Sequence, residues 1–291
     1  RTGMGQALVV GRDAEVKAEL DGLGLGDAFR EINIVNAANS RHLEAYHEFL
    51  YQRLQRRGVD REDAAKMANR DRHIFAALML AHGHGDGLVT GATRKSAPVL
   101  AQIGRVFDLR PQDGTVGITA LLHRGRIVLI GDTLVHEWPD AEDLADIASR
   151  GAAVARGLGL EPRVAFLSFS NFGYPVSERA IKMAEAARVL DSRGVDFEYE
   201  GEMTVDVALN REAAARYPFS RLTAPANVLV VPARHSASIS VKLLQEMAGA
   251  TVLGPILTGA PRPIQICATN STVSDILNMA AIAAGGLATE R

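Results

Sequence analysis

Short runs of residues that are apolar at almost every position recur along this chain, and they constrain its fold more than any other feature. Strands without polar alternation are buried on both faces, which is typical of a sheet covered by helices on each side. We therefore predict a layered α/β fold with strands over these runs. They cover residues 7–10, 32–35, 87–90, 116–121, 127–130, 164–169, 228–231 and 252–257.

The longer stretches between these runs have helical periodicity. Ser177 before Glu178 is a start signal for one of these helices, and Gly194 is a stop signal after its last turn. We predict helices over residues 40–56, 60–69, 72–82, 141–157, 177–192, 236–248 and 271–284.

The length of the chain, 291 residues, favours two domains over one. Trp138-Pro139-Asp140 interrupts the pattern, and a new series of strands and helices runs from there to Gly254. The tail after Gly259 holds one strand and one helix, which is too little for a domain. We therefore predict a first domain over 1–139 plus 259–291 and an inserted second domain over 140–258.

The bulk composition excludes several partners. There are 32 Lys and Arg against 34 Asp and Glu, so the net charge of -2 gives no general attraction for nucleic acid or an anionic membrane. The single cysteine permits no internal disulfide, and no apolar stretch reaches the ~20 residues of a membrane span. We expect a cytoplasmic protein, and the start at Arg1 without Met indicates a piece of a longer chain.

Several local motifs do not fit the function that they first suggest. His82-Gly83-His84 lacks the Cys or carboxylate partners of a metal site, so we predict a loop and no metal there. Gly22 to Gly26 has too few spacers for a dinucleotide fingerprint. Neither a Gly-x-Ser-x-Gly motif nor a Walker motif occurs, which removes serine hydrolases of that type and P-loop enzymes.

Polar residues follow three predicted strands. Arg94 and Lys95 come after the strand at 87–90, where open sheets place ligands and where two cations suit a phosphate group. A solvated basic turn explains them equally well. Residues 168–173 and 232–236 end two further strands in the same way, so we predict a small-molecule site in a cleft between the two domains.

Several sequence motifs, taken in this order, resemble phosphotransacetylases over nearly the whole chain. In the second half they are Asn-Val-Leu-Val-Val-Pro at 227–232, Lys-Leu-Leu-Gln at 242–245 and Gly-Pro-Ile-Leu-Thr-Gly at 254–259. Upstream they are residues 86–92, Asp132, residues 167–170 and the Glu-Gly-Glu-Met turn at 200–203 with Asp206.

The resemblance implies two domains of mainly parallel sheet flanked by helices, an α/β/α architecture also found in isocitrate dehydrogenases. It implies an interdomain cleft in which an acetyl group moves between coenzyme A and phosphate. In that family a Ser-Arg pair grips and stabilises the reacting groups, and an Asp assists deprotonation of the thiol.

The chain departs from this pattern where the chemistry is expected. The family's Ser-Arg falls on Ala268 and Thr269, and only the aspartate is kept, as Asp275. In the family a cationic residue follows in the helix after the position of Lys242, and this position holds Glu246 in the present chain. Thr269 has neither the charge nor the reach of an arginine, so we predict no catalytic residues and no efficient acetyl transfer.

Family motifs combined with the loss of the Ser-Arg pair make this chain similar to the C-terminal region of bacterial NADP-dependent malic enzymes. The residues that favour this branch are 93–95, 132–136, 270–273 and 278–279. The resemblance implies a regulatory region that responds to acetyl-CoA or a related CoA thioester. It implies a homo-oligomer, with a dimer formed through this region. It also implies an upstream domain that oxidatively decarboxylates malate to pyruvate. NADP and a divalent metal are expected only in that upstream domain.

The residues expected to hold the effector come from this resemblance and from the strand ends. Arg94, Lys95 and Arg262 are candidates for the CoA phosphates, Thr269 and Ser271 for its polar backbone. The full predicted acetyl-CoA-binding set is Arg94, Lys95, Asp132, Ser170, Arg262, Thr269, Ser271 and Asp275. Each is also consistent with a surface charge or a helix cap, and Ser271 with the cap of the last helix.

Two other functions stay open at this stage. One is an active phosphate acetyltransferase in which Ser271, or an arginine from elsewhere, replaces the missing pair. The other is an assembly module that binds no small molecule.

Overall fold

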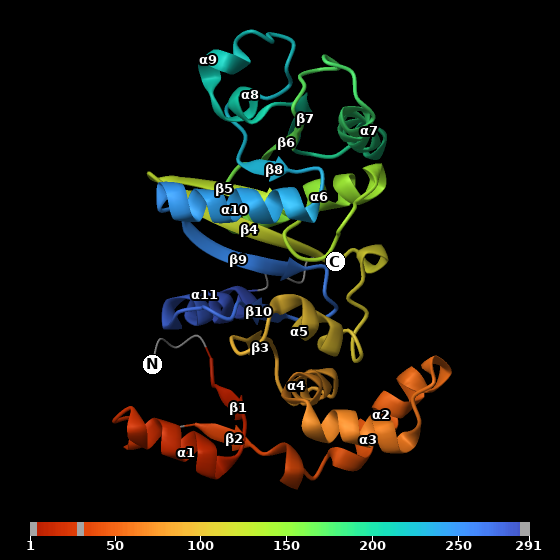
Figure 1. The fold of residues 1–291 in the computed structure, drawn as a ribbon, viewed down its shortest axis with the longest axis vertical. Coiled ribbons are helices and arrows are strands. Elements are labelled where there is room, and N and C mark those ends of the chain that lie inside the picture. Colours follow the sequence, from red (N-terminus) through yellow and green to blue (C-terminus); the bar gives the residue numbers. More distant parts are fainter. Residues whose placement is uncertain (1–4, 28–31, 286–291) are drawn as a thin grey trace. The chain divides into compact units, whose positions relative to one another are not determined.

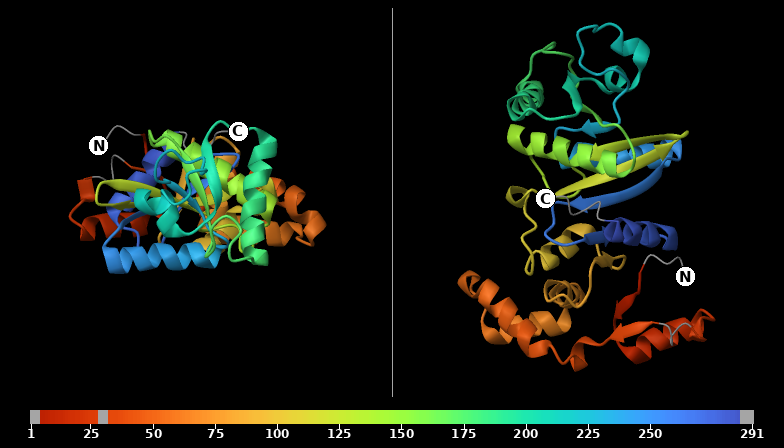
Figure 2. Two further views of the ribbon diagram at one scale, coloured as in Figure 1. Left: turned by 90° about the horizontal axis from the view of Figure 1, so that it is seen from above. Right: turned by 180° about the vertical axis from the view of Figure 1, so that it is seen from behind.

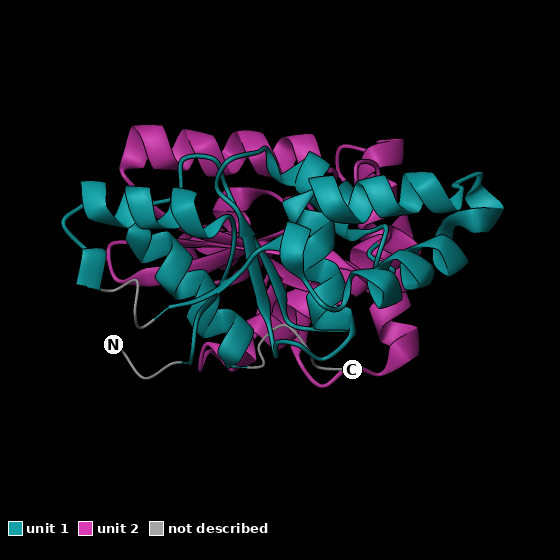
Figure 3. Ribbon diagram, turned by 90° about the horizontal axis from the view of Figure 1, so that it is seen from below, with its two compact units in different colours: residues 1–109, 261–285 teal, residues 110–260, 286–291 magenta. Residues whose placement is uncertain are grey.

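The computed structural model describes residues 5–27 and 32–285, which form two compact units (Figure 1, Figure 3). Unit 1 comprises the described residues up to Leu109 together with Pro261–Gly285, and unit 2 comprises Arg110–Ala260. Both units contain parallel strands flanked by helices, so the predicted α/β fold is confirmed. The ends of the predicted first domain, residues 1–4 and 286–291, lie outside the described residues.

The border between the units differs from the predicted domain boundary. The sequence placed residues 110–139 in the first domain, whereas they belong to unit 2. The reason is strand β4 (Val116–His123), which pairs with β5 (Arg126–Gly131) on one edge and with β9 (Thr251–Thr258) on the other. Trp138-Pro139 therefore marks a turn inside unit 2 and not its beginning.

Unit 2 is built on a six-stranded sheet with the order β7-β6-β8-β5-β4-β9. The four strands from β7 to β5 are parallel, and β4 is antiparallel to both of its neighbours. The remaining strands are β6 (Arg163–Leu167), β7 (Glu198–Met203) and β8 (Val228–Val230). All three residues of β8 are buried, as expected for a strand covered on both faces.

Helices α6 (Ala141–Gly157) and α10 (Arg234–Ala248) cover opposite faces of this sheet (Figure 1, Figure 2). Val228 of β8 lies against α6, whereas the next residue, Leu229, belongs to an apolar cluster that includes Ala237 of α10. Successive strand residues point to opposite faces, so the two helices sandwich the strand. The other helices of unit 2 are α7 (Glu178–Arg193), α8 (Val205–Leu209), α9 (Arg211–Ala214) and the short η4 (Pro111–Asp113).

Unit 1 contains two separate pairs of parallel strands. The first pair is β1 (Leu8–Val10) with β2 (Asn33–Val35), and the second is β3 (Leu88–Gly91) with β10 (Ile264–Cys267). The β10 strand thus joins residues from the end of the chain to its first third.

The central helix of unit 1 is α4 (Arg72–Ala81), seven of whose ten residues are buried. It packs against α3, α5 and β3. The other helices of this unit are α1 (Asp13–Gly22), α2 (Leu43–Leu54), α3 (Arg61–Arg70), α5 (Ser96–Ile103) and α11 (Val273–Ala284), with 3-10 turns η2 (Ala37–Asn39) and η3 (Gln55–Arg57). In the described part of the chain, no helix has the length and apolar character needed to cross a membrane.

Gly151 allows α6 to approach the sheet closely. A Cβ atom at this residue would lie 2.6 Å from Cγ1 of Val228. We predict that Gly151→Ala lowers the free energy of unfolding by about 1–3 kcal/mol through overpacking, although alanine favours a helix over glycine by about 1 kcal/mol. Urea denaturation of the two proteins measures the difference.

Gly22 provides the matched control. It is the last residue of α1, and a Cβ atom there would meet nothing within 4 Å. Gly22→Ala should leave stability unchanged or raise it slightly. Equal effects of the two substitutions would contradict the close approach at Gly151.

Candidate functional site

The carboxyl ends of β3 and β10 lie side by side in unit 1. Cys267 is paired with Gly91, and the N–H of Ala92 donates to the carbonyl oxygen of Cys267 over 3.2 Å. Gly91 has a φ of 106°, and a Cβ atom there would clash with the same carbonyl. Glycine at this position therefore keeps the turns after the two strands in contact.

Two helices begin at this edge, one after each strand. Helix α5 starts at Ser96 after Lys95, and α11 starts at Val273 after Thr272. The first turn of a helix leaves backbone N–H groups unpaired and carries partial positive charge, so it favours anions. This edge is also the place where open parallel sheets bind ligands. We call the residues of the two turns, 91–96 and 267–272, the carboxyl-edge site.

Four of the predicted binding residues meet in this site: Arg94, Lys95, Thr269 and Ser271. The guanidinium group of Arg94 forms an ion pair with Asp71 over 3.0 Å, and its side chain stays 52% exposed. Lys95 is exposed at the start of α5. The ion pair holds Arg94 near the turn and leaves part of its surface open to a ligand.

Asp275 has a structural role in the same region. Its carboxylate accepts hydrogen bonds from the N–H (2.8 Å) and the hydroxyl (2.9 Å) of Thr272. The N–H of Asp275 donates back to the Thr272 hydroxyl over 3.2 Å, which completes a capping box. Thr272, and not Ser271, therefore caps α11, and the alternative assignment of Ser271 as the cap is wrong.

Arg262 does not join the other candidates. It lies in the segment before β10, whereas Thr269 follows the same strand. Seven residues of mostly extended chain span roughly 20 Å. Arg262 is exposed at the amino end of β10, on the opposite edge of the pair from Arg94 and Lys95.

The two reactive side chains at this edge are held in their neutral forms. Burial raises the pKa of the Cys267 thiol, and the negative charge of Asp275 raises it further. Burial also lowers the pKa of His73, whose Nδ1 lies 2.7 Å from the Thr90 hydroxyl. A protonated thiol is a poor nucleophile, so these surroundings disfavour a nucleophilic role for Cys267. Sequence reasoning missed His73, because a histidine in an apolar helix carries no signal of its own.

Asp132 lies in unit 2, directly after β5, and is 2% exposed. Its carboxylate accepts from the N–H groups of Gly117 (3.1 Å), Leu134 (2.6 Å) and His136 (2.8 Å), and from Nδ1 of His136 (2.8 Å). These donors occupy the carboxylate within its own unit. Asp132 thus fixes the loop after β5.

Ser170 is fully buried after β6 in unit 2. Its hydroxyl donates to Glu202 over 2.9 Å, and Glu202 also accepts from the N–H of Gly173 over 2.7 Å. The predicted binding residue is therefore part of an internal network that joins β6 to β7.

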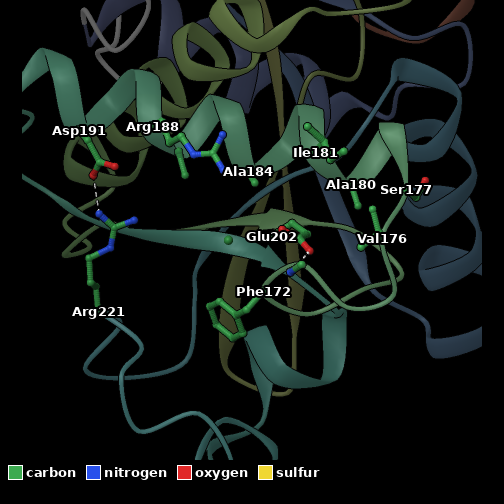
Figure 4. A pocket seen from close by; sticks show the side chains of 13 residues that line it. Phe172, Val176, Ser177, Ala180, Ile181, Ala184, Arg188, Asp191, Glu202 and Arg221 are labelled. Atoms are coloured by element: carbon green, nitrogen blue, oxygen red, sulfur yellow. Dashed lines mark hydrogen bonds and ion pairs between the residues drawn. The ribbon is translucent and has the colours of Figure 1, made fainter.

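A cavity of about 390 Å³ lies next to this network, between α7 and β7 (Figure 4). Small residues of α7, among them Ala180 and Ala184, form its apolar wall, and Glu202 and Arg188 also line it. Arg221 at its rim is held by Asp191 over 2.5 Å. The helix was predicted, but the cavity depends on the packing of α7 on a strand that the sequence pattern did not show.

The buried pair of His136 and Asp132 yields a pH prediction. Burial alone would lower the pKa of His136, but its hydrogen bond to Asp132 and the charges of Asp132, Asp143 and Asp146 together raise it above the usual 6.5. A group with a raised folded-state pKa stabilises the fold fully below its unfolded pKa, and this contribution is lost as the pH rises through the folded value.

We therefore expect His136→Gln to cost more stability at about pH 5.5 than at about pH 8.5. Urea denaturation of the unsubstituted protein and the variant gives the loss of unfolding free energy at each pH. The other titrating groups are the same in the two proteins, so their contributions cancel in each loss. A loss of equal size at both pH values would show that the protonated imidazole is not stabilising.

The sequence and the structure of this chain are similar to those of known proteins. The sequence matches the family described as phosphate acetyl/butaryl transferase over residues 1–284. It is 48% identical over 283 residues to an NADP-dependent malic enzyme of Rhizobium meliloti, a match that covers 97% of this chain and 37% of that protein. An NADP-dependent malic enzyme of Escherichia coli is 33% identical, with 97% of this chain and 38% of that protein covered. The chain thus spans less than half the length of these malic enzymes.

Proteins of more similar length also match. A phosphate acetyltransferase of Treponema pallidum is 30% identical over 95% of this chain and 85% of its own length. Among solved structures, a phosphotransacetylase from Streptococcus pyogenes superposes with a TM-score of 0.86 at 27% identity, covering 97% of this chain and 86% of that chain. The resemblance seen in the sequence is confirmed, and the chain belongs to the phosphate acetyl/butaryl transferase family.

Proposed function

We propose that this chain is the non-catalytic, acetyl-CoA-binding regulatory region, C-terminal in the full-length protein, of an NADP-dependent malic enzyme. One observation carries the proposal: the turn after β10, at the carboxyl edge of a parallel pair, has Ala268 and Thr269 where the resemblance expects Ser and Arg. The match to malic enzymes over 97% of the chain supports the same conclusion.

Acyl transfer to phosphate needs fixed donors for an oxyanion and for the phosphate oxygens. A methyl group at residue 268 and a short hydroxyl at 269 supply no cation at this turn. Loss of one oxyanion donor typically costs on the order of 2.7–4 kcal/mol in the transition state. Because Asp275 is engaged by Thr272, it is not positioned as a free base either.

Binding of a CoA thioester requires less than catalysis. Arg94 and Lys95, together with the first turns of α5 and α11, provide positive charge and N–H donors at one edge. Phosphate groups suit such donors, and Arg offers a planar fork for their oxygens. Thr269 and Ser271, in the turn between β10 and α11, would offer polar groups to the rest of the ligand.

Regulation requires that the effector bind two conformations with different affinity. In this proposal the chain works in the cytoplasm within a homo-oligomer and transmits the change to an upstream domain that decarboxylates malate. That domain, and not this chain, would hold NADP and a divalent metal. Asp132 and Ser170, which have internal partners, would contribute only by shaping unit 2.

An active phosphate acetyltransferase, which moves an acetyl group between CoA and phosphate, is the alternative. The 30% identity to the Treponema pallidum enzyme over 85% of its length favours it. In this case Ser271 or an arginine from another element would replace the missing pair. An assembly module without a ligand is the third possibility.

Calorimetry and an activity assay separate these functions. We expect acetyl-CoA to release or absorb heat with a saturable curve, and acetyl phosphate formation from acetyl-CoA and phosphate to stay at background. No heat at millimolar acetyl-CoA would remove the effector role. Acetyl phosphate above background would establish the transferase.

Arg94→Gln tests the carboxyl-edge site. We expect this variant to weaken acetyl-CoA binding about tenfold, since it removes a charge-assisted hydrogen bond. Arg61→Gln is the matched control, because Arg61 is also an exposed arginine of unit 1 in an ion pair, with Glu48. Calorimetry on both variants gives the comparison, and equal weakening would show a general charge effect instead of a site.

A further inference from the structure

A basic pocket, separate from the carboxyl-edge site, lies in unit 1 at the carboxyl ends of β1 and β2. Gly11 and Arg12 follow β1, and Asn36 follows β2; all three line a cavity of about 430 Å³. The junction between α3 and α4 closes it with Arg70 and Arg72. None of the residues predicted from the sequence to bind acetyl-CoA lines this pocket.

The charges of the pocket are unbalanced. Arg12 is paired with Glu15 over 2.7 Å, and both line the cavity. Neither Arg70 nor Arg72 has an ion-pair partner among residues 5–27 and 32–285. Two arginines therefore line the same cavity without a carboxylate of their own among the described residues.

Neighbouring polar groups are already engaged, which leaves those arginines for a ligand. Asp71 stands between them in sequence, but its carboxylate accepts from the N–H groups of His73 (2.8 Å) and Ile74 (3.2 Å) and pairs with Arg94. The side chain of Asn36 accepts from the N–H of Ala38 over 3.0 Å.

The backbone of the junction is fixed by the same contacts. Arg70 is the last residue of α3 and Arg72 the first of α4, and Asp71 caps α4 between them. α3 also packs on η2, which follows β2. The positions from which the two arginines extend are thus set by secondary structure.

The chemistry of the lining selects the class of ligand. Guanidinium forks bind phosphate oxygens in pairs and hold them more strongly than a neutral group does. No aromatic residue occurs among the described residues of the lining, so a nucleobase would find no aromatic ring to stack on. The volume lies within the range of small-molecule sites.

We propose that this pocket binds the phosphate groups of a small phosphate ester through Arg70 and Arg72. The phosphates have two possible sources: the nucleotide end of a CoA thioester, which rests on the function proposed above, or a separate phosphorylated metabolite. In both cases the phosphates, and not the base, carry the affinity.

Calorimetry with adenosine 3′,5′-bisphosphate tests the proposal. We expect saturable binding that weakens as salt is added, no binding of adenosine, and a loss of about tenfold or more in affinity in the Arg70→Gln/Arg72→Gln variant. Unchanged urea denaturation of this variant confirms that it is folded. Absence of bisphosphate binding at millimolar concentration would overturn the proposal.

Arg56→Gln/Arg57→Gln is the matched control. These two adjacent arginines are also exposed in unit 1 and line none of the cavities described. Their substitution removes the same amount of positive charge as the Arg70→Gln/Arg72→Gln variant. The proposal predicts unchanged bisphosphate binding in this variant, and an equal loss would reduce the effect to surface charge.

Two further titrations identify the source of the phosphates. Weaker acetyl-CoA binding in the Arg70→Gln/Arg72→Gln variant, with 3′-dephospho-acetyl-CoA less affected, would assign the pocket to the effector's nucleotide end. Unchanged acetyl-CoA binding with lost bisphosphate binding would assign it to a separate ester. Arg94→Gln should leave bisphosphate binding intact, so failure of the carboxyl-edge site and failure of this pocket are distinguishable.

Discussion

The pairing of β3 with β10 is the contact on which unit 1 and its site depend. It joins residues 88–91 to residues 264–267, and Gly91 removes the side chain that would keep the two strands apart at their carboxyl ends. Because the strands run parallel, the helices that follow them begin at the same edge. Two N-termini and the Arg94 side chain are therefore brought together by one short ladder, and neither segment alone would form the site.

Three acidic residues that the family resemblance singled out, Asp132, Glu202 and Asp275, have hydrogen-bond partners within the chain. Asp275 caps α11, Asp132 accepts from five donors around the β5 loop, and Glu202 joins Ser170 to Gly173. Asp132 and Glu202 are each 2% exposed, and a carboxylate so far removed from water is stable only when it is hydrogen-bonded, as both are here. Their retention without the Ser-Arg pair is accounted for by folding, so it is no sign of surviving catalysis.

The sequence predicted most strands and helices because their apolar periodicity is strong, as in α6, whose bounds agree with the prediction. It did not predict β7, since Glu198, Glu200 and Glu202 interrupt the apolar pattern. In the structure Glu200 accepts from the N–H of Arg221 over 2.9 Å and Glu202 from Ser170, so an edge strand tolerates them. Side-chain partners distant in sequence cannot be seen in a local pattern.

The site was predictable only in part, for a related reason. Arg94 and Lys95 follow a recognisable strand, whereas Arg70 and Arg72 are basic residues at a helix junction and look like ordinary surface charge. Their role depends on Asp71, whose carboxylate accepts a hydrogen bond from the N–H of His73 at the start of α4 and forms an ion pair with Arg94. The acidic neighbour in sequence is therefore engaged elsewhere, and Arg70 and Arg72 have no ion-pair partner among residues 5–27 and 32–285. Because the partner of Asp71 lies 23 residues further along the chain, no local pattern shows that the two arginines are left unpaired.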